Sequence, residues 1–337
     1  MTHLYSTFKW AFDIKDSDIF FCTADIGWVT GHSYVVYAPL LHGATQVMYE
    51  GAPDFPDASR MWDILQKYKV TIFYTTPTAL RMFMKFGDDI PNSFDLSSLR
   101  LLGTVGEPIN PEVWKWYFKT IGKEKCPIID TWWQTETGAI CIANYPTMDI
   151  KPGSMGKPVP GVNVQVVDEK GDICAVDCIG SIAIELTEPL QPGMFEGYWQ
   201  DDEATAMCFK NGWYYTGDNG SVDKDGYFWF VGRSDDMINS SGYRISPFEV
   251  ESSLLEHPAV LESAVIGKLD EARGEVVKAF IILASNYQPS DELRRDIQAF
   301  MKKQTAPYKY PREIEFVESL PKTISGKIRR IELRQNS

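Results

Sequence analysis

The sequence contains no uninterrupted apolar stretch of the roughly 18 residues that a membrane-spanning helix needs, and its start lacks the pattern of a secretory signal peptide. Basic residues are also in deficit, since 33 Lys and Arg stand against 46 Asp and Glu and leave a net charge of -13. A surface that binds nucleic-acid phosphates needs Lys and Arg in quantity. We therefore expect a soluble, cytoplasmic protein that binds neither a membrane nor a nucleic acid.

Cysteine is infrequent and dispersed, with 6 residues scattered over 337 positions. Small disulfide scaffolds have the opposite pattern, so we expect reduced thiols. Cys174 and Cys178 form one close pair, in GDICAVDCIG, and a zinc or redox protein built on them is one alternative. No second Cys or His pair lies nearby in the sequence, so the pair is better explained as flanking a turn.

The length of 337 residues exceeds what one hydrophobic core usually supports, which predicts two or more domains. Between residues 18 and 133, short apolar runs such as DIFFCTA and VTIFYTT alternate with helical patterns such as SRMWDILQKYK. This alternation is typical of β/α units around a mostly parallel sheet, where ligands collect at the carboxyl ends of the strands. The predicted fold class is thus α/β, with residues 1–150 as a first, partial α/β subdomain.

Two further regions and a linker follow. Residues 151–231 consist of strands punctuated by Gly and Pro, which predicts an antiparallel, β-rich subdomain. Residues 232–237 have the polar composition of a linker, and we expect a hinge there. Residues 238–337 predict a small, mobile α+β carboxyl-terminal domain, in which Ser246 caps a helix that has Pro247 at its first position.

Four parts of the chain carry a combined signature. They are GEPINPE at 106–112, DTWWQTETG at 130–138, WYYTGD at 213–218 with GRSDDMINSSGYR at 232–244, and PKTISGKIRR at 321–330. In this order and spacing they resemble the AMP-forming acyl-CoA synthetases of the adenylate-forming superfamily, and the similarity covers essentially the whole chain. CTADIGWVTGHSY together with DTWWQTETG is most similar to the acetyl-CoA synthetases, the acetate:CoA ligases.

The resemblance implies a reaction in two halves. A carboxylate attacks the α-phosphorus of ATP to give an acyl-adenylate and pyrophosphate, and the thiol of coenzyme A then takes the acyl group. The implied cofactors are ATP, coenzyme A and Mg²⁺, and the implied substrate is acetate or another short-chain carboxylate. Such chemistry needs positioned reactants and charge stabilisation at phosphorus.

The resemblance also implies a nucleotide site. Asp218 is the implied ribose-binding carboxylate, since one acid can accept both ribose hydroxyls. Arg233 and Arg244 are implied phosphate contacts, because a planar guanidinium suits an oxyanion. Asp235 is the implied hinge residue, and Lys327 is the implied catalytic residue, which neutralises charge during adenylation. The other implied ATP or AMP contacts are Gly106, Glu107, Pro108, Asp130, Thr131, Trp132, Trp133, Gln134, Thr135 and Glu136.

The implied acyl pocket has Trp133 as its floor. A rigid indole excludes longer chains sterically, so acetate is the favoured acid over longer ones. The implied walls of this pocket are Val29, Thr30 and Val105. Trp132, its neighbour, is expected to face the opposite side and to lie mainly in the core.

Coenzyme A and the metal have implied contacts as well. The residues implied for coenzyme A are Thr30, Asp54, Ser241, Gly242 and Lys302. The residues implied for Mg²⁺, partly through backbone oxygens, are Leu255, His257 and Val260. The alternative for His257 is a cap at a helix end.

The family's phosphate-binding loop normally precedes the counterpart of STFKWAFDIKDSDIFFCTADIGW, whereas this sequence begins at Met1. We therefore expect a fragment without that loop, with little activity by itself, unless a separate amino-terminal chain supplies the front half. Two alternatives stay open. IKPGSMGKPVPG is closer to medium-chain or branched-chain acyl-CoA ligases, and a nonenzymatic nucleotide-binding remnant is the alternative from a different functional class.

Overall fold

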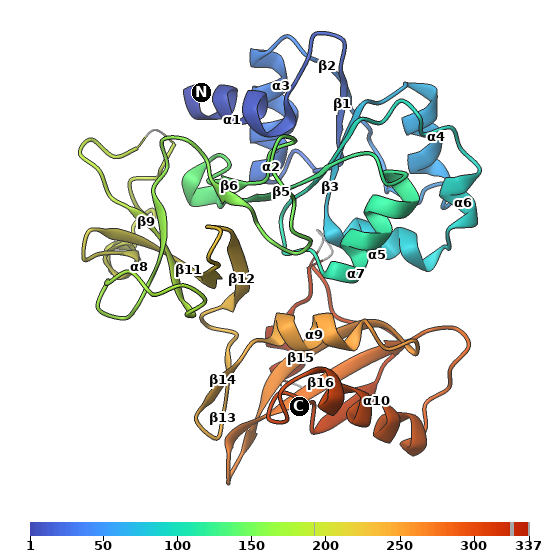
Figure 1. The fold of residues 1–337 in the computed structure, drawn as a ribbon, viewed down its shortest axis with the longest axis vertical. Helices are drawn as coiled ribbons and strands as arrows, with labels where there is room; N and C mark the ends of the chain where they lie inside the picture. Colours follow the sequence, from blue (N-terminus) through green and yellow to red (C-terminus); the bar gives the residue numbers. More distant parts are fainter. Residues whose placement is uncertain (192, 324–326, 336–337) are drawn as a thin grey trace. The chain divides into compact units, whose positions relative to one another are not determined.

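The computed structural model describes residues 1–191, 193–323 and 327–335. The chain divides into two compact units, Met1–Phe230 (unit 1) and Val231–Ser337 (unit 2), which Figure 1 shows in blue to yellow and in orange to red. Each unit has its own hydrophobic core, so each is described by itself.

A seven-stranded sheet forms the centre of unit 1, in the order β2-β1-β3-β4-β5-β6-β7. Strands β1 to β5 are parallel, so their carboxyl ends lie along one edge, whereas β6 and β7 are joined antiparallel. The predicted α/β class with a mostly parallel sheet is confirmed. The strands are β1 (Ile19–Cys22), β2 (Thr45–Val47), β3 (Ile72–Thr75), β4 (Leu101–Thr104), β5 (Ile128–Trp132), β6 (Ile142–Ala143) and β7 (Lys157–Pro158).

Helices cover both faces of this sheet (Figure 1). Because side chains alternate along a strand, Phe20 packs with α1 and η1 on one face, while Phe21 packs with α4 and α5 on the other. Burial on both faces explains why the strands are nearly continuous apolar runs. The helical segments are α1 (Thr2–Phe12), α2 (Val29–Gly31), the π-helix η1 (His32–Tyr37), α3 (Ala38–Leu41), α4 (Arg60–Lys67), α5 (Pro77–Lys85), α6 (Asp89–Asn92), α7 (Pro111–Trp116), the π-helix η2 (Tyr117–Ile121), the 3₁₀ turn η3 (Thr135–Thr137) and α8 (Asp202–Cys208).

An antiparallel sheet completes unit 1, in the order β10-β11-β9-β8 with β12 paired to β11. Its inner face shares one core with α1 and η1, since Ile184 and Tyr214 belong to the same buried cluster as Phe8 and Tyr34. This shared core holds β11 close to the end of β5. The strands are β8 (Val164–Val167), β9 (Gly180–Glu185), β10 (Phe209–Lys210), β11 (Trp213–Val222) and β12 (Phe228–Arg233), whose last residues belong to unit 2.

Unit 2 is a second sheet, in the order β14-β13-β16-β15 with β17 parallel to β16, packed with helices. The hydroxyl oxygen of Ser246 accepts the N–H of Glu249, which confirms the predicted cap of α9. The elements are β13 (Ile238–Ser240), β14 (Tyr243–Ile245), α9 (Pro247–Leu254), β15 (Val260–Asp270), β16 (Gly274–Leu283), α10 (Asp291–Gln304), β17 (Glu313–Phe316) and α11 (Arg330–Gln335).

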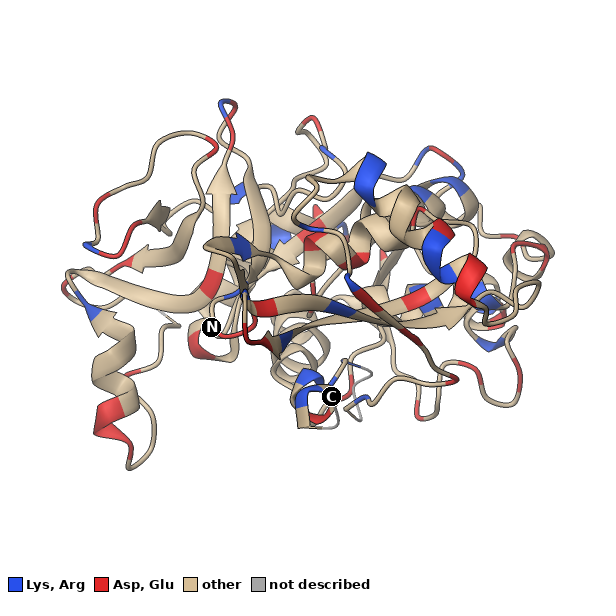
Figure 2. Ribbon diagram, turned by 90° about the horizontal axis from the view of Figure 1, so that it is seen from below, with Lys and Arg blue, Asp and Glu red and all other residues tan. Residues whose placement is uncertain are grey.

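Charges are interspersed along the ribbon, with red acidic segments beside blue basic ones (Figure 2). Within the described ranges, no helix is long and apolar enough to cross a membrane. The contact boundary between the units falls between Phe230 and Val231. The finer division into 1–150, 151–231, a hinge at 232–237 and 238–337 stays a prediction.

Candidate functional site

The carboxyl ends of the parallel strands bring several predicted site residues of unit 1 together. Thr75 of β3 pairs with Thr104 of β4, and Thr104 pairs with Asp130 of β5. The segment 105–108 continues from β4 and Trp133 continues from β5, so both leave the same edge of the sheet. Open α/β sheets bind their ligands at such an edge.

The loop after β4 is tethered through Glu107. Its carboxylate accepts the backbone N–H of Thr78 at 2.7 Å and pairs with the guanidinium of Arg81 at 2.9 Å. Burial alone would raise the pKa of Glu107, but the charge of Arg81 and the bonds from Thr78 outweigh it and hold that pKa below its ordinary value. Exposed Gly106 has a φ of 92°, which glycine adopts without strain. The predicted adenine contact of Gly106, Glu107 and Pro108 would thus involve the backbone of a fixed loop.

Asp130 and Thr131 point into the interior and fix the ends of adjacent strands. The hydroxyl of Thr104 donates to Asp130 Oδ1 at 2.7 Å, and the N–H of Thr131 donates to the same oxygen at 3.0 Å. Burial raises the pKa of Asp130 to about 7, and these two bonds offset the effect only in part. The hydroxyl of Thr131 donates to the carbonyl of Thr104 at 2.8 Å and lies 2.6 Å from the hydroxyl of Tyr74. Direct nucleotide contacts of both residues stay predictions.

Trp132 and Gln134 join the DTWWQTETG segment to β11. The indole N–H of Trp132 donates to Asp218 Oδ2 at 2.9 Å. The side-chain amide of Gln134 donates to the carbonyl of Thr216 at 2.8 Å and accepts the hydroxyl of Tyr214 at 2.9 Å. Trp132 lies in the core, as expected, and is 8% exposed, while Asp218 is 6% exposed. The predicted ribose carboxylate is therefore held by the neighbouring motif.

The rest of the segment forms the single 3₁₀ turn η3. Thr135 is the exposed residue of DTWWQTETG, whereas the others are buried or half-buried. Glu136 accepts the hydroxyl of Tyr198 at 2.8 Å. The carbonyl of Gly138 accepts the hydroxyl of Ser33 at 2.7 Å, which ties the turn to η1. Thr135 is the side chain of this segment best placed to meet a ligand from solvent.

Trp133 lies against the helical stretch that begins with Val29 and Thr30. Its ring meets Tyr34 edge-on, with centroids 5.2 Å apart and planes at 75°. Tyr34 belongs to η1, which continues directly from α2, and π-helical turns are frequent at functional sites. Glycine at position 31 lets this helix start close to its neighbour, because a Cβ there would lie 2.2 Å from a backbone carbonyl.

The remaining members of the predicted acyl pocket lie at the same sheet edge. Val105 is buried directly after β4. The indole Nε1 of Trp133 is buried and has no hydrogen-bond partner among the described residues, although buried indole N–H groups usually find one. The pocket of Val29, Thr30, Val105 and Trp133 stays a prediction.

In unit 2, β13 and β14 form a hairpin whose two-residue turn is Ser241 and Gly242. Both residues have positive φ, 51° and 83°, which tight hairpin turns require and glycine meets without strain. Arg244 follows on β14 and is exposed. Arg233 at the end of β12 is also exposed, and its Nε lies 3.4 Å from Asp235. Arg233, Arg244, Ser241 and Gly242 are thus surface residues of this unit.

Lys327 lies three positions before the start of α11. Its N–H donates to the hydroxyl of Thr323 at 3.1 Å, and its carbonyl accepts the N–H of Thr323 at 2.8 Å. Lys322 and Ile328 form a β-bridge, and Lys322 Nζ pairs with buried Glu262 at 2.7 Å. Residues 324–326 of the predicted motif lie outside the described residues. Lys327 itself is exposed.

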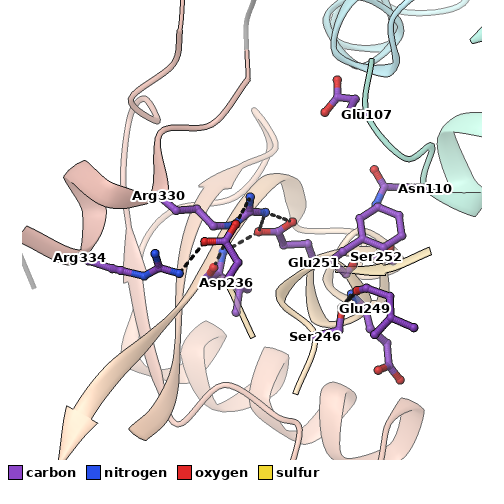
Figure 3. Close-up of polar contacts among 12 residues, drawn as sticks. Glu107, Asn110, Asp236, Ser246, Glu249, Glu251, Ser252, Arg330 and Arg334 are labelled. Atoms are coloured by element: carbon purple, nitrogen blue, oxygen red, sulfur yellow. Dashed lines mark hydrogen bonds and ion pairs between the residues drawn. The ribbon is translucent and has the colours of Figure 1, made fainter. Parts of the chain in front are cut away.

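An ion cluster formed by Asp236, Glu251, Arg330 and Arg334 fastens α11 to the rest of unit 2 (Figure 3). The guanidinium of Arg330 donates to both oxygens of Glu251, at 2.6 and 2.7 Å. Asp236 pairs with Arg334 at 2.6 Å and lies 3.8 Å from Arg330. The sequence prediction missed this cluster, although Arg330 lies in the quoted PKTISGKIRR motif. The cluster anchors the chain three positions after Lys327.

His257 does not fit a metal site through its imidazole. Its Nδ1 accepts the backbone N–H of Ala259 at 3.2 Å, so the ring proton lies on Nε2, 3.3 Å from the carboxylate of Asp296. Both ring nitrogens are therefore engaged. The carbonyl oxygens of Leu255, His257 and Val260 remain as candidate ligands, and hard cations accept such oxygens.

The predicted coenzyme A residues are divided between the units. Thr30 lies in α2 and Asp54 lies, half-buried, in the loop between β2 and α4 of unit 1. Lys302 lies on α10 of unit 2, with its ammonium 4.3 Å from the ring centroid of Tyr310. A joint contact of these residues with coenzyme A stays a prediction.

The cysteine pair gives no support to a zinc protein. Cys174 is partly exposed and Cys178 is exposed. Over the ranges that the structure covers, no group of three or more His, Cys, Asp and Glu side chains could hold a metal ion. The N–H of Cys178 bonds to the carbonyl of Ala175 at 3.0 Å, which is a turn contact.

Fold and site together define a ligand-binding α/β protein, with two motif loops at the carboxyl edge of a parallel sheet and a carboxylate presented by an adjoining antiparallel sheet. The chain belongs to the AMP-binding enzyme family. Residues 1–199 match the model of that family, and residues 249–327 match the AMP-binding enzyme C-terminal domain.

Curated relatives agree with this assignment. The chain is 50% identical over 334 residues to an acetyl-coenzyme A synthetase of Pyrobaculum aerophilum, covering 97% of this chain and 49% of the relative. It is 48% identical over 339 residues to an acetyl-coenzyme A synthetase of Pasteurella multocida, covering 98% of this chain and 51% of the relative. The chain therefore spans about half the length of these relatives.

A solved structure extends the comparison to the fold. An anthranilate CoA ligase in complex with anthranoyl-AMP superimposes with a TM-score of 0.87 at 38% identity, over 99% of this chain and 62% of that protein. That protein binds an acyl-adenylate. The similarity confirms the adenylate-forming fold and the predicted family.

Proposed function

We propose that this chain carries the nucleotide site, the acid pocket and the catalytic lysine of an AMP-forming acetate:CoA ligase. The main support is the contact between DTWWQTETG and Asp218 at the sheet edge from which the segment 105–108 leaves β4, in a chain 50% identical to an acetyl-coenzyme A synthetase. A purely structural role would not require three separate motifs to meet at one sheet edge. Acetate, ATP and coenzyme A are the proposed substrates, and the cytoplasm is the proposed location.

In the proposed site, unit 1 recognises the nucleotide and the acid. Asp218 accepts the ribose hydroxyls, and the backbone of Gly106 to Pro108 lies along the adenine. Thr135 is exposed at the start of η3, where it can donate to a phosphate oxygen. Trp133 closes the acid pocket, because an indole held edge-on against Tyr34 cannot move aside for a longer chain.

Unit 2 supplies positive charge and contacts for coenzyme A. Arg233 and Arg244 bind phosphate oxygens, and the turn of Ser241 and Gly242 lies along the thiol arm of coenzyme A, where the absence of a side chain at 242 gives room. Lys302, together with Thr30 and Asp54, contacts the nucleotide end of coenzyme A. Carbonyl oxygens of Leu255, His257 and Val260 are the proposed Mg²⁺ ligands, and a bound Mg²⁺ would neutralise nearby negative charge.

The proposed reaction proceeds by two displacements. A carboxylate oxygen of acetate bonds to the α-phosphorus of ATP, and the bond to pyrophosphate breaks. The Lys327 ammonium donates to the oxygens on which charge develops, which stabilises the transition state. In the second half, the coenzyme A sulfur bonds to the acyl carbon, AMP leaves with the bonding electrons, and the thiol proton passes to solvent.

AMP binding by the 337-residue chain tests the proposal, because its nucleotide contacts lie within the chain. Calorimetry with AMP and with acetyl-AMP should give saturable binding, and Asp218→Asn should weaken both because an amide offers one acceptor where the carboxylate offers two. No binding of either nucleotide by the folded chain would overturn the proposal. Acetate-dependent formation of AMP would extend it to catalysis.

A second candidate is a nonenzymatic nucleotide-binding protein. The sequence leaves this candidate open, and the chain spans about half the length of these curated relatives. It predicts AMP binding without acetate-dependent turnover, even when the amino-terminal half of a relative is added as a separate chain. Turnover restored by that addition would instead support a ligase assembled from two chains. If that assay shows a preference for a medium-chain or branched acid, this acid would replace acetate as the proposed substrate.

A further inference from the structure

The two adjacent tryptophans have different polar environments. The Trp132 indole N–H donates to Asp218 Oδ2 at 2.9 Å, although 86 positions separate these residues. The Trp133 Nε1 is buried without a hydrogen-bond partner in the part of the chain that the structure describes. Of the two indole N–H groups, that of Trp132 is therefore hydrogen-bonded, and its acceptor is the carboxylate that the proposed function assigns to ribose.

The backbone under Asp218 is irregular. Strand β11 pairs regularly with β9 up to Tyr215, and the register then shifts before pairing resumes at Asn219. Such an irregularity re-aims side chains and leaves residues outside the ladder of hydrogen bonds. Asp218 lies within it, so the regular ladder does not by itself orient its side chain.

Contacts from the DTWWQTETG segment orient Asp218 instead. Gln134 binds the carbonyl of Thr216 at 2.8 Å and the hydroxyl of Tyr214 at 2.9 Å, which fixes the backbone just before Asp218. The indole N–H of Trp132 then fixes the carboxylate itself. Both partners are nearly buried, and a hydrogen bond in such surroundings is stronger than one in water.

We propose that Trp132 is a positioning residue for ribose recognition: its N–H holds Asp218 aimed at the 2′ and 3′ hydroxyls of the nucleotide. This inference rests on the proposed function. An indole N–H can only donate, so this bond orients Asp218 and keeps it an acceptor, and the amide of Gln134 lies 3.5 Å from the same oxygen. Trp132 thus pre-arranges the acceptor before the nucleotide arrives.

The effect of this pre-arrangement on nucleotide affinity can be measured. Fixing one side chain on binding costs conformational free energy, which corresponds to an affinity about 3- to 10-fold weaker. Trp132→Phe keeps a planar apolar ring and removes the donor, so the nucleotide itself must then immobilise Asp218. The loss should appear only for nucleotides whose hydroxyls engage Asp218.

The test uses the full chain and calorimetric titration with AMP and with 2′,3′-dideoxy-AMP. Trp132→Phe should bind AMP about 3- to 10-fold more weakly than the unmodified chain and bind dideoxy-AMP equally well. Trp116→Phe is the matched control, because half-buried Trp116 on α7 also donates its indole N–H to a carboxylate, that of Asp88, at 2.6 Å. The control should bind both nucleotides like the unmodified chain.

Four outcomes would contradict the inference. Equal weakening of AMP and dideoxy-AMP by Trp132→Phe would overturn the inference, because it indicates loss of packing, and so would unchanged AMP binding. If the unmodified chain binds AMP and dideoxy-AMP equally, the assignment of Asp218 to ribose fails, and the inference fails with it. If the unmodified chain binds neither nucleotide, the proposed function itself is overturned.

A second variant guards against a folding defect. Replacing Trp132 with β-(3-benzothienyl)alanine keeps the bicyclic shape and substitutes sulfur for the N–H. It should reproduce the selective loss of AMP affinity while thermal unfolding stays that of the unmodified chain. A variant that unfolds normally and retains full AMP affinity would show that the N–H does not position Asp218.

Discussion

The two units hold their candidate site residues in different ways. In unit 1, Glu107, Asp130 and Asp218 each lie in a network of short hydrogen bonds, and Asp130 and Asp218 are almost entirely buried. In unit 2, Lys327 and Arg244 are exposed, and Arg244 follows the hairpin turn of β13 and β14. Under the proposed function, this difference would mean that unit 1 holds groups in place for a ligand's shape, whereas unit 2 presents exposed cations to a ligand's charge.

This division has a physical reason. A buried acceptor loses little freedom when a ligand binds, so its contacts favour specificity. An exposed ammonium stays hydrated and costs nothing in desolvation until it meets an anion. If the two units differ in this way, substitutions in unit 1 should change recognition or stability, whereas substitutions at the exposed cations of unit 2 should change rate.

The largest effect is expected at Lys327. In a form of the protein that turns over acetate, Lys327→Ala should slow adenylation about 10²- to 10³-fold, because one transition-state donor is lost. Thioester formation from supplied acetyl-AMP should persist. Pyrophosphate exchange measures the first half, and thioester assay measures the second. Lys303→Ala, at an exposed lysine of α10, is the control and should change neither. Equal loss in both halves would refute the role in adenylation.

The next effect concerns stability and pH in unit 1. The pKa of Asp130 is raised to about 7 by burial, whereas that of an Asp in an unfolded chain is about 3.9. Between these values the folded state holds a proton that the unfolded state lacks, so stability falls as pH rises from about 4 through about 7. Asp130→Asn should remove this loss and keep the bonds from Thr104 and Thr131.

Urea unfolding at pH 5 and pH 8 measures this effect. All 10 tryptophans lie in unit 1, so their fluorescence follows that unit alone. Asp130→Asn should gain roughly 2–4 kcal/mol relative to the unmodified chain at pH 8, and much less at pH 5. An equal difference at both pH values would show that Asp130 does not titrate with a raised pKa.

Acid selectivity should respond to Trp133. Trp133→Gly removes the ring that lies edge-on against Tyr34 and opens space at the predicted floor of the pocket. The preference for acetate over butyrate should fall about 10- to 100-fold, since each methylene in an apolar pocket is worth about 1–3 kcal/mol. The ratio of kcat/KM for the two acids measures it. Trp213→Gly, at a half-buried tryptophan of β11, is the control. An unchanged ratio in the Trp133 variant removes Trp133 from the pocket.

Local patterns were sufficient to predict the framework of both units. Phe20 and Phe21 lie in an apolar run followed by a helical pattern, and they pack on opposite faces of the sheet as a buried parallel strand requires. Ser246 and Pro247 form a helix start that depends on neighbouring residues only, and it was predicted correctly. Signals of this kind span a few residues and survive in any tertiary context.

Long-range contacts could not be predicted in this way. The bond from Trp132 to Asp218 depends on a shared core that brings β11 to the end of β5, and no pattern within either segment encodes that meeting. The tether of Glu107 by Arg81 likewise joins the loop after β4 to helix α5, across 26 positions. The motifs identified Glu107 and Asp218 as candidate site residues but gave no information about the residues that hydrogen-bond to them.

The smallest effect tests the other side of the comparison, the anchoring of unit 2. Glu251→Gln should destabilise this unit by about 1–3 kcal/mol, less than a fully buried pair would cost, because the side chain of Arg330 is 22% exposed. Since unit 2 contains no tryptophan, hydrogen exchange of β15 and β16 amides measures the loss. Glu332→Gln, which breaks the more exposed pair with Arg329, should cost no more than about 0.5 kcal/mol. If the two variants lose the same stability, the ion cluster does not anchor α11. Burial would then not decide which ion pairs stabilise unit 2.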